Sequence, residues 1–150
     1  MKIQIQNENF VLHPSGALFW ESKKIIIISD VHFGKVSHFR KHGIAIPQNA
    51  VSENFRKIND VLDYFQPEKI IFLGDLFHSS KNAEWDLFEE WISNHNQETY
   101  LVEGNHDIID QKHYYEIGIL IVDVLQIDQF FFTHHPTERD GLFNFSGHIH

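Results

Sequence analysis

The chain contains no cysteine among its 150 residues. Disulfide bonds, thiolate metal sites, iron–sulfur clusters and cysteine nucleophiles are therefore excluded. The sequence also lacks a run of roughly 18 apolar residues, which is the length that a membrane-spanning helix needs. Residues 1–9 have no apolar core of the kind that a secretory signal peptide carries. We therefore expect a cytoplasmic protein that does not bind membranes.

Positive charge is scarce, because 12 Lys and Arg stand against 21 Asp and Glu, for a formal net charge of −9. This balance argues against the broad basic surface that drives nonspecific DNA binding. It leaves phosphate substrates possible, because bound divalent cations would make the local field positive. Histidine is abundant, with 12 residues. Since imidazole is the commonest metal-ligand side chain, this excess favours a metal site.

The hydrophobic pattern predicts one α/β domain over residues 1–150, with two sheets covered by helices. Unbroken apolar runs are typical of strands that are buried on both faces. Apolar residues spaced by three and four predict helices. We expect strands at 10–12, 17–20, 25–29, 69–73, 99–102, 119–122, 129–133 and 142–145, and a turn at 123–128. We expect helices at 34–42 and 51–65, a short helical or turn segment at 110–116, and a helix after Asn82 that buries Trp85, Phe88, Trp91 and Ile92.

Polar motifs follow five of the predicted strands. Ligands of open α/β sheets collect beyond the carboxyl ends of strands, so these motifs are candidates for a site. A polar turn explains any one motif equally well, since Gly, Asn and Asp are turn formers. Five motifs in succession, each after an apolar run, favour a site. The motifs are Asp30-Val31-His32, Gly74-Asp75, Gly104-Asn105-His106-Asp107, His134-His135 and Gly147-His148-Ile149-His150.

These motifs supply seven oxygen and nitrogen donors that suit two adjacent divalent ions better than one tetrahedral zinc. The spacing Asp-x-His or His-x-His aims alternate side chains at one place from an extended segment. Such donors admit Mn²⁺, Fe, Zn²⁺ or Ni²⁺, and metal availability decides among them as much as affinity does. The seven donors are Asp30, His32, Asp75, Asn105, His134, His148 and His150.

The order of the motifs resembles that of the calcineurin-like metallophosphoesterase family, over residues 25–150. Segments 29–35, 38–40, 43–44, 74–79 and 134–136 are similar to the bacterial DNA-ligase-associated metallophosphoesterase subfamily. Its members are regarded as Mn-dependent phosphodiesterases or nucleases tied to DNA repair. The resemblance implies an α/β (α+β) fold, a two-sheet β-sandwich flanked by helices. Because family members usually continue with further strands, we expect this chain to be truncated at its C-terminus.

The resemblance also implies a role for each motif residue. His106 would stabilise the transition state or protonate the leaving oxygen, and Asp107 would orient its neighbours. Two divalent ions, with Mn²⁺ as the favoured metal, would activate a bridging water for in-line attack on a phosphodiester. The first ion would be held by Asp30, His32 and His150, the second by Asn105, His134 and His148, with Asp75 between them.

Four further residues are candidates for substrate binding. Lys35 and Arg40 belong to a basic cluster that would bind a substrate phosphate, although a solvated charged face is the alternative. His78 follows Gly74-Asp75 closely enough to line the site. His134 and His135 compete for one ligand role. We favour His134 as the ligand because it directly follows a strand, which leaves His135 to contact substrate.

We therefore expect a metal-dependent phosphodiesterase or nuclease that acts on nucleic acid, with single-stranded DNA as the favoured substrate and a functional link to DNA ligase or helicase. Hydrolysis of nucleotides or other small phosphoesters is an alternative that the acidic net charge favours. A noncatalytic scaffold of the same fold is a third alternative, but such scaffolds should have lost metal ligands, and this chain has all seven. The oligomeric state and endo- versus exonucleolytic action stay open.

Overall fold

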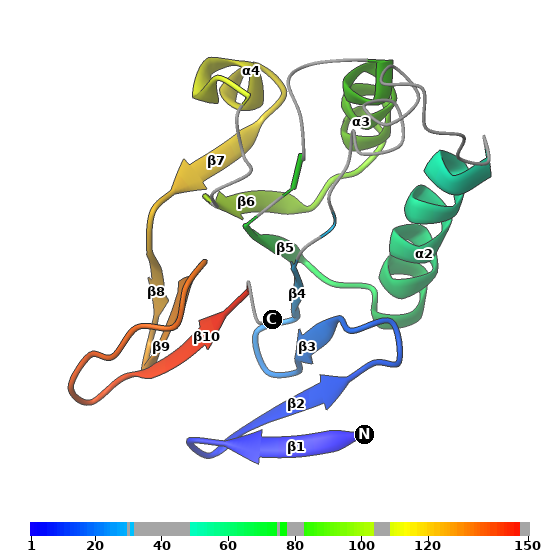
Figure 1. Cartoon of the computed structure of the whole chain (residues 1–150). Helices are drawn as coiled ribbons and strands as arrows, with labels where there is room; N and C mark the ends of the chain where they lie inside the picture. Colours follow the sequence, from blue (N-terminus) through cyan, green and yellow to red (C-terminus); the bar gives the residue numbers. More distant parts are fainter. Residues whose placement is uncertain (30, 32–48, 75, 78–82, 104–108, 148–150) are drawn as a thin grey trace.

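The computed structural model describes residues 1–29, 31, 49–74, 76–77, 83–103 and 109–147 (Figure 1). Its strands form a seven-stranded sheet in the order β1-β2-β3-β4-β5-β6-β7 and a three-stranded sheet in the order β10-β9-β8. The strands are β1 Lys2–Ile5, β2 Glu8–Leu12, β3 Leu18–Trp20, β4 Ile25–Ser29, β5 Lys69–Leu73, β6 Glu98–Val102, β7 Ile119–Val122, β8 Leu125–Ile127, β9 Phe130–Thr133 and β10 Phe143–Ser146. The helices are α2 Asn49–Phe65, α3 Ala83–Ser93 and α4 Gln111–Glu116.

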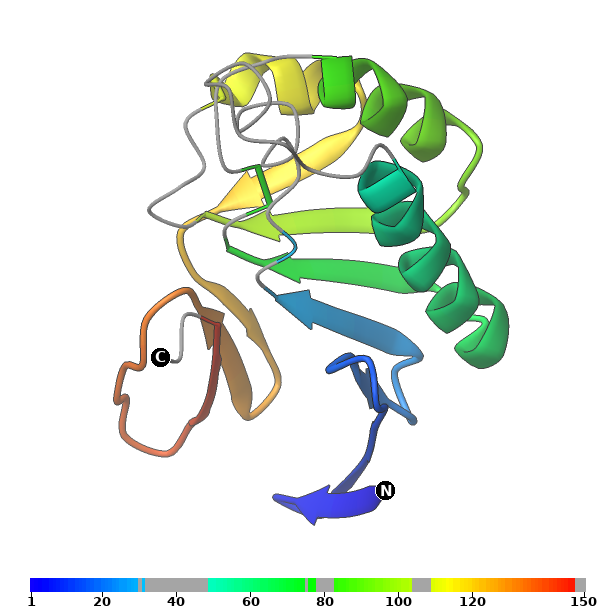
Figure 2. The ribbon, with the colours of Figure 1, turned by 45° about the vertical axis from the view of Figure 1, so that its right-hand side comes forward.

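Three layers build the molecule. The described helices cover one face of the large sheet, and the small sheet lies against its other face (Figures 1 and 2). The helix side of the core includes Phe72, Trp85 and Phe88. Between the sheets, Trp20 and Phe130 are fully buried and their rings meet edge to face at 4.9 Å. The predicted α/β architecture with two sheets and flanking helices is confirmed.

The centre of the large sheet is parallel, because β4, β5, β6 and β7 all run in one direction. Strands β4 and β5 are covered on both faces along most of their length, which is why residues 25–28 and 70–73 are unbroken apolar runs, whereas β7 leaves Leu120 44% exposed. In register, Ser29 of β4 pairs with Leu73 of β5, and Leu73 pairs with Val102 of β6. Three strands therefore end side by side at one edge of the sheet.

The helices follow the predicted apolar stripes. Ile58 and Leu62 of α2 are buried, and Gln66 ends the helix in a left-handed conformation before the buried Pro67. On α3, the predicted residues Trp85, Phe88, Trp91 and Ile92 are all buried in the core, so none of this stripe is open for stacking on bases. No described helix is long and apolar enough to cross a bilayer.

Two strands differ from the sequence-based prediction. The turn predicted at 123–128 is wrong, because β8 occupies its centre and pairs antiparallel with β9. Leu125 and Ile127 point into the core between the sheets, and the Asp residues on either side hid this short alternation. Strand β1 was not predicted either. Its hairpin with β2 turns at Gln6 and Asn7, both with positive φ, as two-residue hairpin loops require.

Candidate functional site

Two of the motif-bearing strands lie together in the small sheet. Strands β9 and β10 are parallel, with Thr133 paired to Ser146 in register. Because parallel neighbours end at the same edge, His134 and Gly147 leave the sheet next to each other. The Gly147 N–H donates to the Thr133 carbonyl at 3.4 Å. The sequence motifs that begin at His134 and at Gly147 therefore begin at adjacent positions, at the same edge of the small sheet.

The side chain of Asn144 on β10 fixes the segment that follows β9. Its Nδ2 donates to the Thr133 hydroxyl at 3.0 Å and to the Phe131 carbonyl at 3.1 Å. Its Oδ1 accepts from the Thr137 backbone N–H at 3.0 Å. The Asn144 amide thus forms hydrogen bonds with Thr133 before the His134-His135 pair and with Thr137 after it. The direction of the chain at His134 is set by β10.

The ends of the two sheets touch at two glycines. Gly74 follows β5 with φ +76°, and a Cβ there would lie 2.8 Å from Cγ and Cε1 of the His134 ring and closer still to Nδ1. At Gly147 a Cβ would lie 2.5 Å from the Leu73 carbonyl oxygen and 3.4 Å from Cβ of Ser29. Only glycine allows such approach without displacing its neighbours. The ends of β4, β5, β9 and β10 therefore converge (Figure 1). We call this region, around Gly74, His134 and Gly147, the junction of the two sheets.

The two adjacent histidines have different surroundings. His134 is only 4% exposed and lies against Gly74, whereas His135 is exposed. Their rings meet edge to face at 4.6 Å between centroids. The His135 carbonyl accepts hydrogen bonds from the Thr133 hydroxyl at 2.6 Å and the Thr137 hydroxyl at 2.9 Å. His134 therefore faces the junction of the sheets, and His135 flanks it on the solvent side.

Most predicted site residues lie outside the described part of the chain. Within that part, no three His, Asp or Glu side chains gather closely enough to hold a metal ion. The predicted ligands outside it are Asp30, His32, Asp75, Asn105, His148 and His150. The predicted catalytic and substrate residues outside it are His106, Asp107, Lys35, Arg40 and His78.

The described junction nevertheless fits a divalent metal centre. It presents a buried imidazole, that of His134, at the point where four strands end. The residues that follow those ends in sequence, such as Asp30 and Asp75, add only oxygen and nitrogen donors. This donor set suits borderline and hard divalent ions, and parallel strand ends are where such sites form.

Two acidic residues near the junction were not singled out from the sequence. Glu103 follows β6 and Asp123 follows β7, and both line an open cleft of about 360 Å³ with His134 and His135. The Glu103 carboxylate accepts a hydrogen bond from Gln111 Nε2 at 3.1 Å. Their position directly after buried strands was the available signal. The side of the junction next to β6 and β7 is therefore acidic.

Comparison with known proteins gives a consistent result. The model of the calcineurin-like phosphoesterase family matches residues 23–150. The fold is similar to the crystal structure of Pseudomonas putida nuclease MPE, with a TM-score of 0.86 and 23% sequence identity, over 100% of this chain and 73% of that chain. At this identity the likeness establishes the fold alone. No curated protein matches the sequence.

Proposed function

The chain belongs to the calcineurin-like phosphoesterase family and is a metal-dependent phosphoesterase, and from this we propose that it hydrolyses phosphodiester bonds in nucleic acid, with single-stranded DNA as substrate. The observation that carries the proposal is the convergence of the ends of β4, β5, β9 and β10, joined by the contacts of Gly74 with His134 and of Gly147 with Leu73. The Asp30, Asp75, His134 and His148 motifs all start from these ends. The name of the similar solved structure, a nuclease, supports this choice of substrate class.

We propose that the family's two divalent ions are held as the sequence resemblance implies, with Mn²⁺ in both positions. When bound, such ions polarise a phosphoryl oxygen and lower the pKa of a water. The remaining steps, which are positioning, proton transfer and substrate binding, fall to side chains of the protein. Buried His134 keeps its ring fixed between Gly74 and His135. His106 supplies a proton or positive charge at the leaving oxygen, Asp107 orients its neighbours, and Lys35, Arg40, His78 and His135 contact the substrate.

On the resemblance to the ligase-associated subfamily, we propose that this reaction serves DNA repair in the cytoplasm, with a functional link to DNA ligase or helicase. The alternative is a small nucleotide phosphodiester, and the acidic cleft at Glu103 and Asp123 favours it, because these carboxylates oppose the approach of a long polyanion from that side.

Substrate assays with and without metal test the function. The purified protein with Mn²⁺ should hydrolyse a single-stranded oligonucleotide and bis(p-nitrophenyl) phosphate. A chelator should abolish turnover, and added Mn²⁺ should restore it. The oligonucleotide affinity should fall as salt rises, because released counterions accompany phosphate contacts. Turnover of cyclic nucleotides without turnover of DNA would establish the small-substrate alternative. Absence of both metal binding and hydrolysis would establish the scaffold.

The metal content of two alanine variants tests the assignment of the adjacent histidines. We expect the wild type to bind two Mn²⁺ per chain, His134→Ala to bind about one, and His135→Ala to keep two. The reason is that buried His134 faces the sheet junction while exposed His135 flanks it. Metal analysis after equilibration with Mn²⁺ provides the measurement. Loss of an ion from His135→Ala but not from His134→Ala would reverse the assignment.

A further inference from the structure

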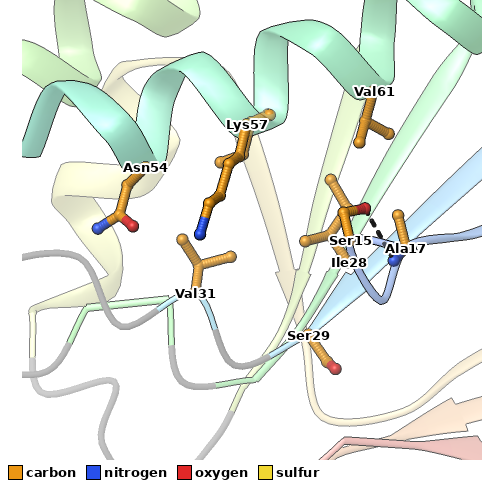
Figure 3. A pocket seen from close by; sticks show the side chains of 9 residues that line it. Ser15, Ala17, Ile28, Ser29, Val31, Asn54, Lys57 and Val61 are labelled. Carbon is orange, nitrogen blue, oxygen red and sulfur yellow. Dashed lines mark hydrogen bonds between the residues drawn. The ribbon is translucent and has the colours of Figure 1, made fainter. Parts of the chain in front are cut away.

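A second cleft, of about 180 Å³, opens beside the first metal motif. It lies between α2 and the end of β4, and Val31 forms part of its wall (Figure 3). In the sequence Val31 stands between Asp30 and His32, two of the three ligands predicted for the first ion. Val31 is therefore a member of the first metal motif that lines the cleft, and none of the lining residues was predicted to bind substrate.

The lining of the cleft combines an apolar wall with a polar mouth. Ile28, Val31 and Val61 supply the apolar part, and Asn54 and Lys57 reach from α2 toward Val31 (Figure 3). Its volume is below the roughly 300–1,000 Å³ that is typical for drug-sized ligands. A flat ring with apolar faces and a polar edge suits such a space. The Asn54 amide offers both a donor and an acceptor to that edge.

Lys57 interacts with the acidic residues of its own helix only over a longer range, since its charge contributes weakly to the lowered pKa of Glu53. Arg56 is bonded to both Glu53 and Asp60, and it is the main cause of the lowered pKa of Glu53. Within the described part of the chain no carboxylate forms an ion pair with Lys57. An exposed ammonium at the mouth of an apolar cleft complements the phosphate of a bound nucleotide.

An aromatic surface continues the cleft away from the metal motif. Tyr64 lies one turn of α2 beyond Val61 and is 72% exposed. Its ring is 5.7 Å from the ring of His13, and His13 Nδ1 is 2.8 Å from the hydroxyl of Ser15, which lines the cleft. Exposed aromatic rings beside a cationic groove are the usual stacking sites of single-stranded nucleic acid.

The opposite side of the junction is unfavourable for the same ligand. The cleft at His134 and His135 is larger, at about 360 Å³, but it carries the carboxylates of Glu103 and Asp123. Like charges facing a phosphate backbone disfavour binding. The difference in charge between the two clefts therefore favours binding of a phosphate backbone at the α2 cleft over binding at the cleft that carries Glu103 and Asp123.

We propose that the α2 cleft is a subsite for one nucleoside of a single-stranded nucleic acid next to the cleaved phosphate, with Lys57 on the adjoining phosphate and Tyr64 stacking on the next base. This subsite rests on the proposed nuclease function. It deepens that function by giving the strand a path along α2, away from Glu103 and Asp123.

Two pairs of surface variants test the subsite. Tyr64→Ala should weaken binding of a fluorescent single-stranded oligonucleotide about tenfold, since a stacked base contributes that order of affinity. Lys57→Ala should weaken binding and reduce the slope of log K against log salt by about 0.7, the value for one phosphate of a single strand. The matched controls Tyr115→Ala and Lys112→Ala, exposed on α4, should leave both the affinity and the slope at wild-type values.

Hydrolysis separates the subsite from the function itself. The Lys57→Ala and Tyr64→Ala variants should raise the KM for the oligonucleotide at least fivefold more than the KM for bis(p-nitrophenyl) phosphate, which has no nucleoside. Equal effects on the two substrates, or binding losses no larger than those of the controls, would overturn the subsite. If the wild type hydrolyses neither substrate, the proposed function fails, and the binding measurements still decide whether the cleft holds a strand.

Discussion

Replacement of Gly74 by alanine is expected to lower kcat/KM for bis(p-nitrophenyl) phosphate by at least about 100-fold, because misplacement of catalytic groups by about 1 Å costs this much. The new methyl group would overlap the buried ring of His134. The ring and the end of β5 must then move apart, and with them the residue that follows Gly74, the proposed bridging ligand Asp75. Gly74→Ala is therefore expected to separate the two sheets at their junction.

The matched control for this variant is Gly141→Ala. Gly141 has φ +77° against +76° for Gly74, but a Cβ at Gly141 would meet no atom within 4 Å. Both variants carry the strain of a left-handed alanine, about 1–2 kcal/mol. Gly74→Ala adds the overpacking of the sheet junction, about 1–3 kcal/mol. Thermal unfolding and kcat/KM are the measurements. If the two variants lose activity equally, close contact between the sheets has no role in catalysis.

The second large effect is expected for His106→Asn, with kcat for a single-stranded oligonucleotide lowered about 10²–10⁴-fold, the usual contribution of a general acid. Asparagine keeps a polar side chain but cannot transfer a proton. The Mn²⁺ content should stay at the wild-type value, because the neighbouring Asn105, and not His106, is the proposed ligand. The control His95→Asn, at a histidine bonded to the Trp91 carbonyl after α3, should retain wild-type kcat.

The leaving group distinguishes the two roles open to His106. Loss of proton donation should harm the oligonucleotide, whose leaving oxygen is a poor one, far more than bis(p-nitrophenyl) phosphate, whose leaving group departs without a proton. Loss of transition-state charge stabilisation should harm both substrates alike. Full turnover of both substrates by a metal-loaded variant would remove His106 from the mechanism.

The sequence was sufficient to predict the strands that carry the site, because the signals are local. Residues 25–28 and 70–73 are unbroken apolar runs, and a polar motif follows each. The adjacency of their ends also followed from the general behaviour of parallel strands. Strand β8 was missed because its three residues, in the short segment from Asp123 to Asp128, give too short an alternation to distinguish from a turn.

Other parts of the site depend on contacts between residues distant in the chain. Glu103 and Asp123 stand at the ends of different strands, and only the order of the sheet brings them to one cleft with His134. Lys57 and Tyr64 belong to an ordinary amphipathic helix, and packing of α2 against the large sheet brings Lys57 to one cleft with Ser15 and Val31 and brings Tyr64 to the ring of His13. No local pattern carries that information.

The approach of Gly147 to Leu73 and of His134 to Gly74 has a consequence for the order of folding. Each contact joins residues that are far apart in the chain, and such pairs form only after the loss of loop entropy that closing the intervening chain requires. Hairpins such as β1–β2 and β8–β9 are local and can form early. The junction is then the last part to assemble, and ions that bind only the assembled junction would stabilise the native state by mass action.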